Sequence, residues 1–520
     1  MRTRWIAVMI CSGLSEQLAP AQNGSQFRDW TAGSQESSRM PKTTCADLRS
    51  QTGYELSVTL ATVIAATSDA PEHCRVEGQV LPEVRFQVNL PAGWNGRLYM
   101  FGNGGFAGES FDAQPRVAAR NRALQRGFAT ASTDTGHDGA AEPLASFAVN
   151  SQKLLDYAFR AVHVTAETAK RLIRVYYREP PSRAYFDGCS TGGRQGLMSA
   201  QRFPEDFDGI VVGAPVLDFS GTMTSYAWIA QAVAAAPIPG PKLNILADRI
   251  YAKCDGADGL KDGLIDDPRK CDFSPARDLP KCAGDADGAG CFTAPQIEAL
   301  GRIYADVMGG GKRLFPGWPA GAEVAGPAGQ SGWIPWLVRN DGRTISVNFG
   351  ESFFRYMGFP EKDPQWTLSR FDFAKDPARM TRIRQMLDAT DPDLKRFEAR
   401  GGKIVMYYGW ADQALNARMG VEYYEQMRER MGAPADGFFR LFMVPGMFHC
   451  AGGVGTSTFD ALTPLVAWVE RGAAPERIQA ARVAGGRTVR TRPLCPYPQV
   501  AKYKGTGSID EAANFECARP

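Results

Sequence analysis

A pentapeptide of the form glycine-X-serine-X-glycine occupies residues 188–192 of this 520-residue chain. Its serine, Ser190, follows a short apolar run at residues 183–187 and precedes a helical pattern at residues 193–203. In a sharp turn from strand to helix, glycines avoid steric clashes and leave a serine hydroxyl exposed at the helix N-terminus. We therefore predict that Ser190 is a nucleophile. The alternative is a glycine-rich turn without a catalytic role.

A serine nucleophile needs a neighbouring base, which is usually a histidine held by a carboxylate. The four histidines of the chain are His73, His137, His163 and His449. Where a serine lies on such a strand-to-helix turn, the acid and then the histidine follow it along the chain. Only His449 follows Ser190, so we predict that His449 is the base.

The acid is predicted from its position after a late strand. Asp412 lies in the segment Tyr-Gly-Trp-Ala-Asp at residues 408–412, directly after the predicted strand 404–408. Its role would be to hold the imidazole in the correct tautomer and to stabilise the imidazolium. Asp391 and Asp393 are alternatives that spacing alone does not exclude.

A tetrahedral intermediate needs backbone N–H groups directed at its oxyanion. One donor is predicted to be the amide of Thr191, the residue after the nucleophile. The other is expected from the glycine-rich segment 102–106, which follows the predicted strand 97–101, and we assign it to Gly105. An ordinary turn is the alternative for this segment.

Eleven cysteines are present, and none shows the CxxC spacing of zinc or redox sites. Setting aside Cys11, which lies in a predicted signal peptide, leaves an even set of ten that favours disulfides. Sequence neighbours predict the pairs Cys45–Cys74, Cys254–Cys271, Cys282–Cys291 and Cys495–Cys517, which leaves Cys189 for Cys450. Because a disulfide holds its Cα atoms within about 4.4 to 6.8 Å, this last bridge would bring Ser190 beside His449.

Carboxylates and glycines are concentrated between Cys254 and Cys271. Hard oxygen ligands on a tight loop suit Ca²⁺, although the spacing is not that of an EF-hand. The predicted ligands are the carboxylates of Asp255, Asp258 and Asp262 and the main-chain carbonyls of Leu260 and Leu264. A solvated acidic turn is the alternative. The calcium is expected to be structural.

Two parts of the chain alternate short apolar runs with helical patterns, as a mostly parallel sheet covered by helices requires. Predicted elements include strands 97–101, 183–187, 403–408 and 438–444 and a helix at 151–174. We predict an α/β-hydrolase fold whose catalytic domain comprises residues 45–217 and 401–520. The intervening residues 218–400, rich in glycine, proline and aspartate and poor in periodic elements, are predicted to form a lid domain.

The first residues combine two arginines, an apolar stretch from Trp5 to Leu14 and an Ala-Pro-Ala segment at 19–21, which is typical of a signal peptide at residues 1–21. Residues 22–44 are expected to form a flexible leader. The protein is therefore predicted to be secreted or periplasmic. A formal charge of +3 without a basic, aromatic-rich run disfavours a nucleic-acid partner, and no later segment resembles a membrane span.

From Cys45 to Cys517 the chain resembles the tannase and feruloyl esterase family, which includes the mono(2-hydroxyethyl) terephthalate hydrolases. The segments that carry the resemblance are 188–194 (Gly-Cys-Ser-Thr-Gly-Gly-Arg), 409–412 (Gly-Trp-Ala-Asp), 448–450 (Phe-His-Cys) and the acidic loop 255–268. The resemblance implies a bonded Cys189–Cys450 pair, a calcium-binding lid loop and Asp412 as the acid.

The resemblance also implies a carboxylic ester hydrolase acting on small esters of aromatic acids such as ferulate, chlorogenate or gallate. Lid aromatics would line the acyl pocket, and the candidates are Trp333, Trp336, Phe349, Phe353, Phe354 and Tyr356. Hydrolysis of terephthalate monoesters is an alternative, and a serine peptidase of the same fold is another. From a different class, the chain could be a secreted calcium-binding module without catalytic activity.

Overall fold

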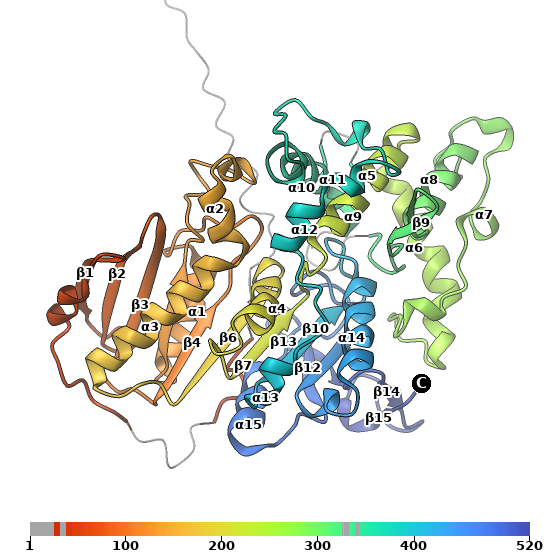
Figure 1. Ribbon diagram of the computed structural model, residues 1–520. Helices are drawn as coiled ribbons and strands as arrows, with labels where there is room; N and C mark the ends of the chain where they lie inside the picture. Colours follow the sequence, from red (N-terminus) through yellow and green to blue (C-terminus); the bar gives the residue numbers. More distant parts are fainter. Residues whose placement is uncertain (1–24, 32–37, 325, 327–331, 340–342) are drawn as a thin grey trace, which may run out of the picture.

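The computed structural model describes residues 25–31, 38–324, 326, 332–339 and 343–520. The predicted signal peptide lies outside these described residues. A nine-stranded sheet forms the centre of the molecule, with strand order β1-β2-β3-β5-β4-β6-β7-β10-β11 (Figure 1). Pairing is antiparallel from β1 to β5 and parallel from β5 to β11.

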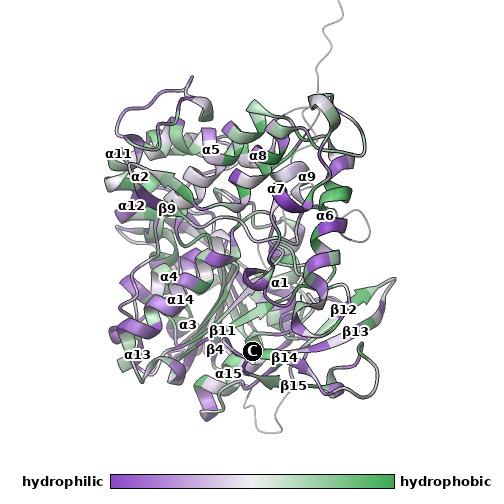
Figure 2. Cartoon of the chain, turned by 90° about the vertical axis from the view of Figure 1, so that its right-hand side faces the viewer, coloured by the Kyte–Doolittle hydropathy of each residue, from purple (hydrophilic) through white to green (hydrophobic). Residues whose placement is uncertain are grey.

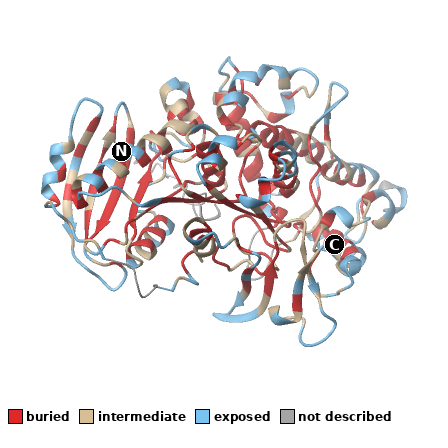
Figure 3. Ribbon diagram, turned by 60° about the horizontal axis from the view of Figure 1, so that its bottom comes forward, coloured by how far each residue is buried: buried red, intermediate tan, exposed pale blue. Residues whose placement is uncertain are grey.

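The strands span β1 Leu56–Ile64, β2 His73–Val80, β3 Val84–Pro91, β4 Arg97–Phe101, β5 Ala129–Thr133, β6 Arg183–Cys189, β7 Gly209–Gly213, β10 Lys403–Gly409 and β11 Phe439–Val444. All residues of β5 and β7 are buried, and burial is nearly continuous in β10. Strands covered on both faces read as near-continuous apolar runs, and β10 is predicted from such a run. Figure 3 shows the buried residues following these central strands.

The main helices outside the segment between β7 and β10 are α1 Gln114–Gln125, α2 Ser151–Leu155, α3 Ala161–Tyr177, α4 Thr191–Arg202, α14 Ala417–Met431 and α15 Leu462–Arg471. Of these, α1, α3, α4, α14 and α15 pack against strands of this sheet. The helix predicted at 151–174 exists, but a π-helical turn at Asp156–Arg160 separates α2 from α3. Such turns insert one extra residue into a helix and often occur at functional sites.

The segment between β7 and β10 is richer in helices than its sequence indicated. It contains α5 Phe219–Ala235, α6 Gly240–Cys254, α7 Pro275–Asp278, α8 Ala294–Tyr304, α9 Trp333–Trp336, α10 Ile345–Phe353, α11 Asp376–Arg379, α12 Thr381–Leu387 and α13 Lys395–Ala399, with the short strands β8 Val307–Gly309 and β9 Lys312–Phe315. Helix α5 is buried over most of its surface, so its sequence lacks the 3.6-residue alternation that marks a surface helix. In Figure 1 helices α5 to α12 lie together above the β10 side of the sheet, whereas α13 lies lower, near α15.

The chain leaves the sheet for the lid and returns from it at adjacent points. The Ala389 amide donates to the Leu217 carbonyl at 2.7 Å. Beside this bond, the backbone amide and the hydroxyl of Ser220 both donate to the Asp388 carboxylate, at 3.0 and 2.7 Å. The segment that enters the predicted lid and the segment that leaves it are therefore hydrogen-bonded to each other at residues 217–220 and 388–389.

All five predicted disulfides are present, with Cα–Cα distances between 4.9 and 5.9 Å. Two small antiparallel pairs complete the C-terminal part, β12 Ile478–Ala484 with β13 Arg487–Leu494 and β14 Val500–Tyr503 with β15 Phe515–Ala518. Green and purple residues are mixed along β12 and β13 in Figure 2, and these two strands are exposed where they join each other and mostly buried at their other ends.

Residues 25–31, within the segment expected to be a flexible leader, pack against the catalytic domain. Gln26 and Phe27 are each 2% exposed. The Phe27 ring contacts the rings of Tyr99 and Phe128 at centroid distances of 5.2 and 5.3 Å. In the part of the chain that the structure describes, no helix is long and apolar enough to cross a bilayer.

Candidate active site

Ser190 lies on a sharp turn between β6 and α4. Its backbone has φ 63° and ψ −122°, a conformation that residues other than glycine rarely adopt. Its amide donates to the Gly213 carbonyl at 2.9 Å, and its own carbonyl accepts from the Arg194 amide at 3.1 Å. Ser190 is partly exposed, whereas Cys189 and Thr191 on either side are buried.

The glycines around Ser190 are required by close backbone approaches. A Cβ atom on Gly188 would lie 2.5 Å from the Gly192 carbonyl carbon, and one on Gly193 would lie 2.4 Å from the Gly213 oxygen. Because backbone atoms cannot give way as a flexible side chain can, any larger residue would displace the turn. The glycines therefore permit the geometry that exposes the Ser190 hydroxyl.

Asp412 and His449 form a buried hydrogen-bonded pair. The His449 Nδ1 atom lies 2.8 Å from the Asp412 Oδ2 atom, and the two residues are 5% and 1% exposed. The other carboxylate oxygen of Asp412 accepts from the amides of Ala414 and Leu415, at 2.9 and 2.8 Å. These bonds fix the carboxylate after β10 and leave one oxygen for the imidazole.

The alternative acids Asp391 and Asp393 make contacts elsewhere. The Asp391 carbonyl accepts from the Tyr423 hydroxyl at 3.1 Å. The Asp393 carboxylate accepts from the guanidinium of Arg430 at 2.6 Å. The structure pairs His449 with Asp412 and not with either of these residues.

A disulfide joins the residue before the serine to the residue after the histidine. The Cα atoms of Cys189 and Cys450 are 5.9 Å apart across a sequence separation of 261 residues. Each cysteine is fully buried, and Cys450 has a positive φ of 63°. The bridge therefore ties the Ser190 turn directly to the loop after β11 that carries His449.

Gln413, which the sequence analysis did not single out, also positions the histidine loop. Its Oε1 atom accepts from the His449 backbone amide at 3.1 Å. Gln413 is 5% exposed and directly follows Asp412, so the same loop holds both the ring and the backbone of His449. Its position beside the predicted acid was the only signal that could have identified it.

The predicted oxyanion segment at 102–106 contacts the Ser190 turn. A Cβ atom on Gly102 would lie 2.6 Å from the Gly192 Cα atom. The backbones of segment 102–106 and of the Ser190 turn are therefore in direct contact, with no room for a side chain between them. Gly105 has a φ of 50°, and the Ala107 amide closes a tight turn with the Gly104 carbonyl at 2.8 Å. The Gly105 carbonyl accepts from the hydroxyls of Tyr157 and Thr191. Gly105 and Thr191, the two predicted donors, are thus in direct contact.

Two lid aromatics adjoin these loops. The Trp336 ring meets the His449 ring edge to face at a centroid distance of 6.2 Å. Phe349 packs on Phe106 at 4.9 Å and reaches Gly105. The other predicted wall residues contribute mainly to the lid itself. Trp333, Phe353 and Phe354 are at most 1% exposed, and Phe354 packs on Trp366 and Phe371 within the lid.

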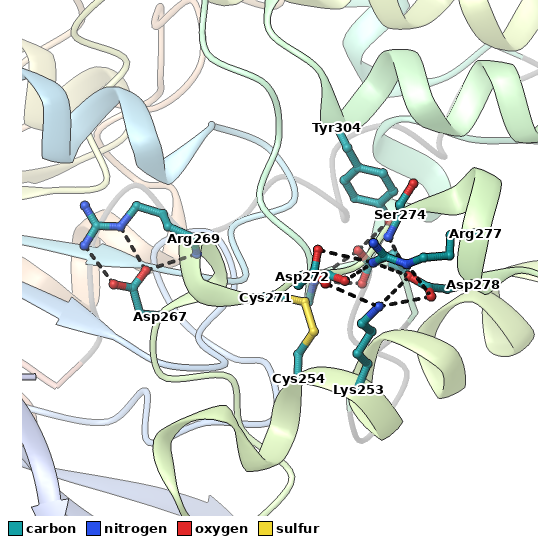
Figure 4. Close-up of a disulfide and its surroundings, with 12 residues drawn as sticks. Lys253, Cys254, Asp267, Arg269, Cys271, Asp272, Ser274, Arg277, Asp278 and Tyr304 are labelled. Carbon is teal, nitrogen blue, oxygen red and sulfur yellow. Dashed lines mark hydrogen bonds and ion pairs between the residues drawn. A yellow bond between two sulfur atoms is a disulfide. The ribbon is translucent and has the colours of Figure 1, made fainter.

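The predicted calcium loop is closed by the Cys254–Cys271 disulfide (Figure 4). Outside the loop, Lys253, the residue before Cys254, forms an ion pair with Asp278 at 3.0 Å. Within the loop the carboxylates accept from backbone amides, Asp255 from that of Asp262 and Asp258 from that of Leu260. The loop is therefore a tight turn that its own carboxylates hold together.

The carboxyl groups of this loop crowd one another. Burial together with the charges of Asp258 and Asp262 raises the pKa of Asp266, and burial raises that of Asp258. The Asp262 carboxylate also accepts a hydrogen bond from Arg492. Over the described residues, no three Asp, Glu, His or Cys side chains are grouped as a metal site would require. The close approach of these carboxyl groups is what a bound cation would stabilise. The hydrogen bond from Arg492, however, already occupies one oxygen of Asp262, which is a predicted calcium ligand.

Comparisons with known proteins agree on one family. The sequence profile described as "Tannase and feruloyl esterase" matches residues 68–518. The chain is 36% identical over 526 residues to mono(2-hydroxyethyl) terephthalate hydrolase of Piscinibacter sakaiensis, covering 88% of this chain and 87% of that protein. It is 32% identical over 470 residues to a probable feruloyl esterase B-2 of Aspergillus terreus, covering 84% of this chain and 83% of the relative.

Solved structures show the same fold. Feruloyl esterase B from Aspergillus oryzae superposes with a TM-score of 0.78 at 26% identity, covering 91% of this chain and 99% of that one. Another esterase from Aspergillus oryzae gives a TM-score of 0.79 at 27% identity, with the same coverage of both chains. The predicted α/β-hydrolase fold is confirmed.

Proposed function

Since the chain belongs to the tannase and feruloyl esterase family and is a carboxylic ester hydrolase, we propose that it is a secreted serine esterase that cleaves esters of aromatic acids through an acyl-enzyme on Ser190. The observation that carries the proposal is the Cys189–Cys450 bridge, which joins the Ser190 turn to the loop of the His449–Asp412 pair. Preferred substrates would be feruloyl, chlorogenic or galloyl esters. Five disulfides support an oxidising compartment.

The proposed reaction proceeds in two acyl-transfer steps. The Ser190 hydroxyl attacks the ester carbonyl while His449 Nε2 takes its proton, and Asp412 stabilises the imidazolium through Nδ1. The amides of Gly105 and Thr191 would donate to the oxyanion. His449 then returns the proton to the departing alcohol. A water molecule, deprotonated in turn by His449, releases the acid and regenerates Ser190.

The lid supports aromatic acyl groups in this proposal. Trp336 contacts His449 and Phe349 lies beside Gly105, so apolar rings adjoin both of these proposed site residues. An aromatic acid lying between such rings would be oriented by stacking and by apolar burial. These two residues are therefore the proposed walls of the acyl pocket.

The test combines a labelled nucleophile with a substrate panel. A fluorophosphonate is expected to label Ser190, and Ser190→Ala is expected to abolish both labelling and turnover while the protein keeps its circular dichroism spectrum. Rates on methyl ferulate, methyl gallate, chlorogenate and a peptide amide define the specificity. Turnover by Ser190→Ala at the rate of the unaltered protein would refute the assignment.

Hydrolysis of mono(2-hydroxyethyl) terephthalate is the second candidate function. The observation that favours it is the 36% identity to a hydrolase of that compound, which exceeds the 32% identity to the probable feruloyl esterase. The same panel separates the two candidates when the terephthalate monoester is included. A kcat/KM highest on that monoester would favour the second function.

We also propose that the lid binds one structural Ca²⁺ through Asp255, Asp258 and Asp262, with the carbonyls of Leu260 and Leu264. The supporting observation is the crowding of carboxyl groups on this loop, which a divalent cation would relieve. The ion would stiffen the loop and take no part in the acyl transfer.

Metal analysis of the purified protein tests this calcium proposal. About one Ca²⁺ per chain is expected, and removal by a chelator should lower Tm. Asp258→Asn should reduce the calcium content, whereas Asp363→Asn, an exposed lid carboxylate paired with Arg370, should leave it unchanged. A protein that binds no calcium, with a Tm insensitive to both calcium and chelator, would contradict the proposal.

A further inference from the structure

A buried tyrosine lies behind the Gly105 turn and has no part in the mechanism above. Tyr157 belongs to the π-helical turn between α2 and α3 and is 1% exposed. Its hydroxyl donates to the Gly105 carbonyl at 3.1 Å. Its ring packs against Phe106 and Phe147, with centroid distances of 6.3 and 5.3 Å. The phenol therefore contacts the predicted oxyanion segment, which the lid ring of Phe349 also contacts.

The two peptide groups flanking Gly105 are both held in place. The Gly104–Gly105 peptide is oriented by the Ala107 amide, which donates to the Gly104 carbonyl at 2.8 Å. In a trans peptide the N–H points opposite to the C=O, so this bond also sets the direction of the Gly105 N–H. The next peptide is fixed through the Gly105 carbonyl, which Tyr157 and Thr191 approach as hydroxyl donors from two different elements.

Arg194 connects the π-helical turn to the helix that starts after Ser190. Its guanidinium donates to the carbonyls of Ala158 and Tyr157, at 2.9 and 3.2 Å, and lies 5.0 Å from the centre of the Tyr157 ring. Its backbone amide donates to the Ser190 carbonyl. Arg194 is fully buried. The position of Tyr157 is therefore set relative to the Ser190 turn through Arg194.

We infer that Tyr157 is a positioning residue for the oxyanion hole: its hydroxyl holds the Gly105 carbonyl, which fixes the Gly105–Phe106 peptide and so restrains the rotation of Gly105 that would turn its N–H away from the developing oxyanion. This inference rests on the proposed function, because it concerns the donor that the acyl transfer would use. Burial raises the pKa of the phenol, so it remains a neutral donor at the pH of the reaction.

The effect should fall on the transition state more than on substrate binding. An oxyanion forms only as the carbonyl becomes tetrahedral, so a misdirected N–H weakens stabilisation of charge that the bound ester does not yet carry. Losing an oxyanion donor itself costs roughly 10²- to 10³-fold in kcat. Losing a residue that only directs the donor should cost less, about 10-fold, with KM changed by less than about 2-fold.

The experiment compares Tyr157→Phe with a matched control, Tyr177→Phe. Tyr177 is also buried and also donates its hydroxyl to a backbone carbonyl, that of Pro91 at 2.6 Å, but on the far end of α3. Each variant loses one buried phenol-to-carbonyl bond, so the stability costs should be similar. The kcat is expressed per site labelled by a fluorophosphonate, which removes any contribution from unfolded protein.

We expect Tyr157→Phe to lower kcat about 10-fold and Tyr177→Phe to leave it within 2-fold. An arylboronic acid, which forms a tetrahedral anion on the serine, should bind Tyr157→Phe more weakly by the same factor as the loss in kcat. The carboxylic acid product should bind both variants equally. In a double variant with Thr191→Val the losses should be non-additive, because both hydroxyls hold the same oxygen.

Two results would overturn the inference in distinguishable ways. Normal labelling of Ser190 together with equal kcat values for Tyr157→Phe and Tyr177→Phe would reject the role of Tyr157 alone. Absence of labelling in the unaltered protein would reject the proposed function and this inference with it. If Tyr157→Phe does not fold, Thr191→Val should show the same selective loss in kcat, and an unchanged kcat there would contradict the inference.

Discussion

The backbone of Ser190 is held in a conformation that costs on the order of 1–3 kcal/mol for a residue other than glycine. Its amide and carbonyl are both hydrogen-bonded within the turn, and the Cys189–Cys450 bridge anchors the preceding residue. Such over-determination is what allows the strained backbone of Ser190, the proposed nucleophile, to persist. At the scale of single residues, the site is thus a set of groups whose orientation is fixed before substrate arrives.

His137 makes a residue-scale prediction about acid stability. It is 4% exposed, stacks on Phe147 at 3.8 Å, and neither ring nitrogen has a hydrogen-bond partner among the described residues. Burial lowers its pKa to about 4, against about 6.5 in an unfolded chain. As the pH falls from 6.5 to 4, the unfolded chain binds a proton that the folded protein does not. The free energy of unfolding should therefore decrease by about 3 kcal/mol.

His137→Gln removes this proton uptake and should flatten the decrease between pH 6.5 and pH 4, as measured by urea unfolding across that range. His163→Gln is the control of opposite sign. The hydrogen bond to Asp206 raises the pKa of His163, so that histidine stabilises the protein at low pH and loses its effect as the pH rises. A decrease of unaltered size in His137→Gln would show that His137 is not the group responsible.

At the scale of elements, the proposed active site is assembled from the loops that follow several strands. The loops after β4, β6, β10 and β11 carry Gly105, Ser190, Asp412 and His449. Parallel strands bring their carboxyl ends to one edge of the sheet, so residues remote in sequence converge there. The disulfide acts on the same scale, because it links two of these loops and not two separate domains.

Removal of that disulfide should affect stability and activity together. The loop it closes spans 261 residues, and the chain-entropy relation gives about 5.5 kcal/mol for a loop of that size. The double variant Cys189→Ala, Cys450→Ala should lose roughly that stability, and its kcat should fall more than about 10-fold because the Ser190 and His449 loops can separate. Urea unfolding and kcat per labelled site measure the two effects.

The matched control is Cys282→Ala with Cys291→Ala in the lid. That bridge closes only 9 residues, so about 2–3 kcal/mol is expected, with kcat unchanged. An unchanged kcat in the Cys189 and Cys450 variant would show that the fold aligns serine and histidine without the covalent link.

At the scale of the whole molecule, residues 25–31 connect parts of the fold that are far apart in sequence. The Gln26 side chain donates to Asp187 on β6 and accepts from the amides of Ala461 and Leu462 at the start of α15. It thereby joins the strand that leads to Ser190 to a helix some 270 residues later. Phe27 fills the aromatic cluster beneath it.

Phe27→Ala should therefore destabilise the entire catalytic domain. Truncating a phenylalanine that is 2% exposed costs about 3–5 kcal/mol through lost burial and an unfilled cavity. Met40→Ala, which alters an exposed residue nearby in sequence, should change the free energy of unfolding by less than about 0.5 kcal/mol. Equal Tm values for the two variants would mean that the segment contributes nothing to folding.

The sequence by itself determined those features whose cause is local. The glycines around Ser190, the order of serine, acid and histidine, and the even set of cysteines identify chemistry that a strand, a turn and a disulfide impose on neighbouring residues. Central strands are predictable for the same reason, because a strand that is buried on both faces needs a run of apolar residues.

Only the tertiary structure decided the rest. The donation from Tyr157 to Gly105, the contact of Arg194 with that tyrosine and the contact of Trp336 with His449 join residues 37 to 113 positions apart. These contacts arise from the packing of the folded chain, and neither the periodicity of apolar residues nor the spacing of motifs in the sequence predicts them. Helix α5 shows the same limit, because a helix buried on nearly all sides carries no alternation by which its sequence could reveal it.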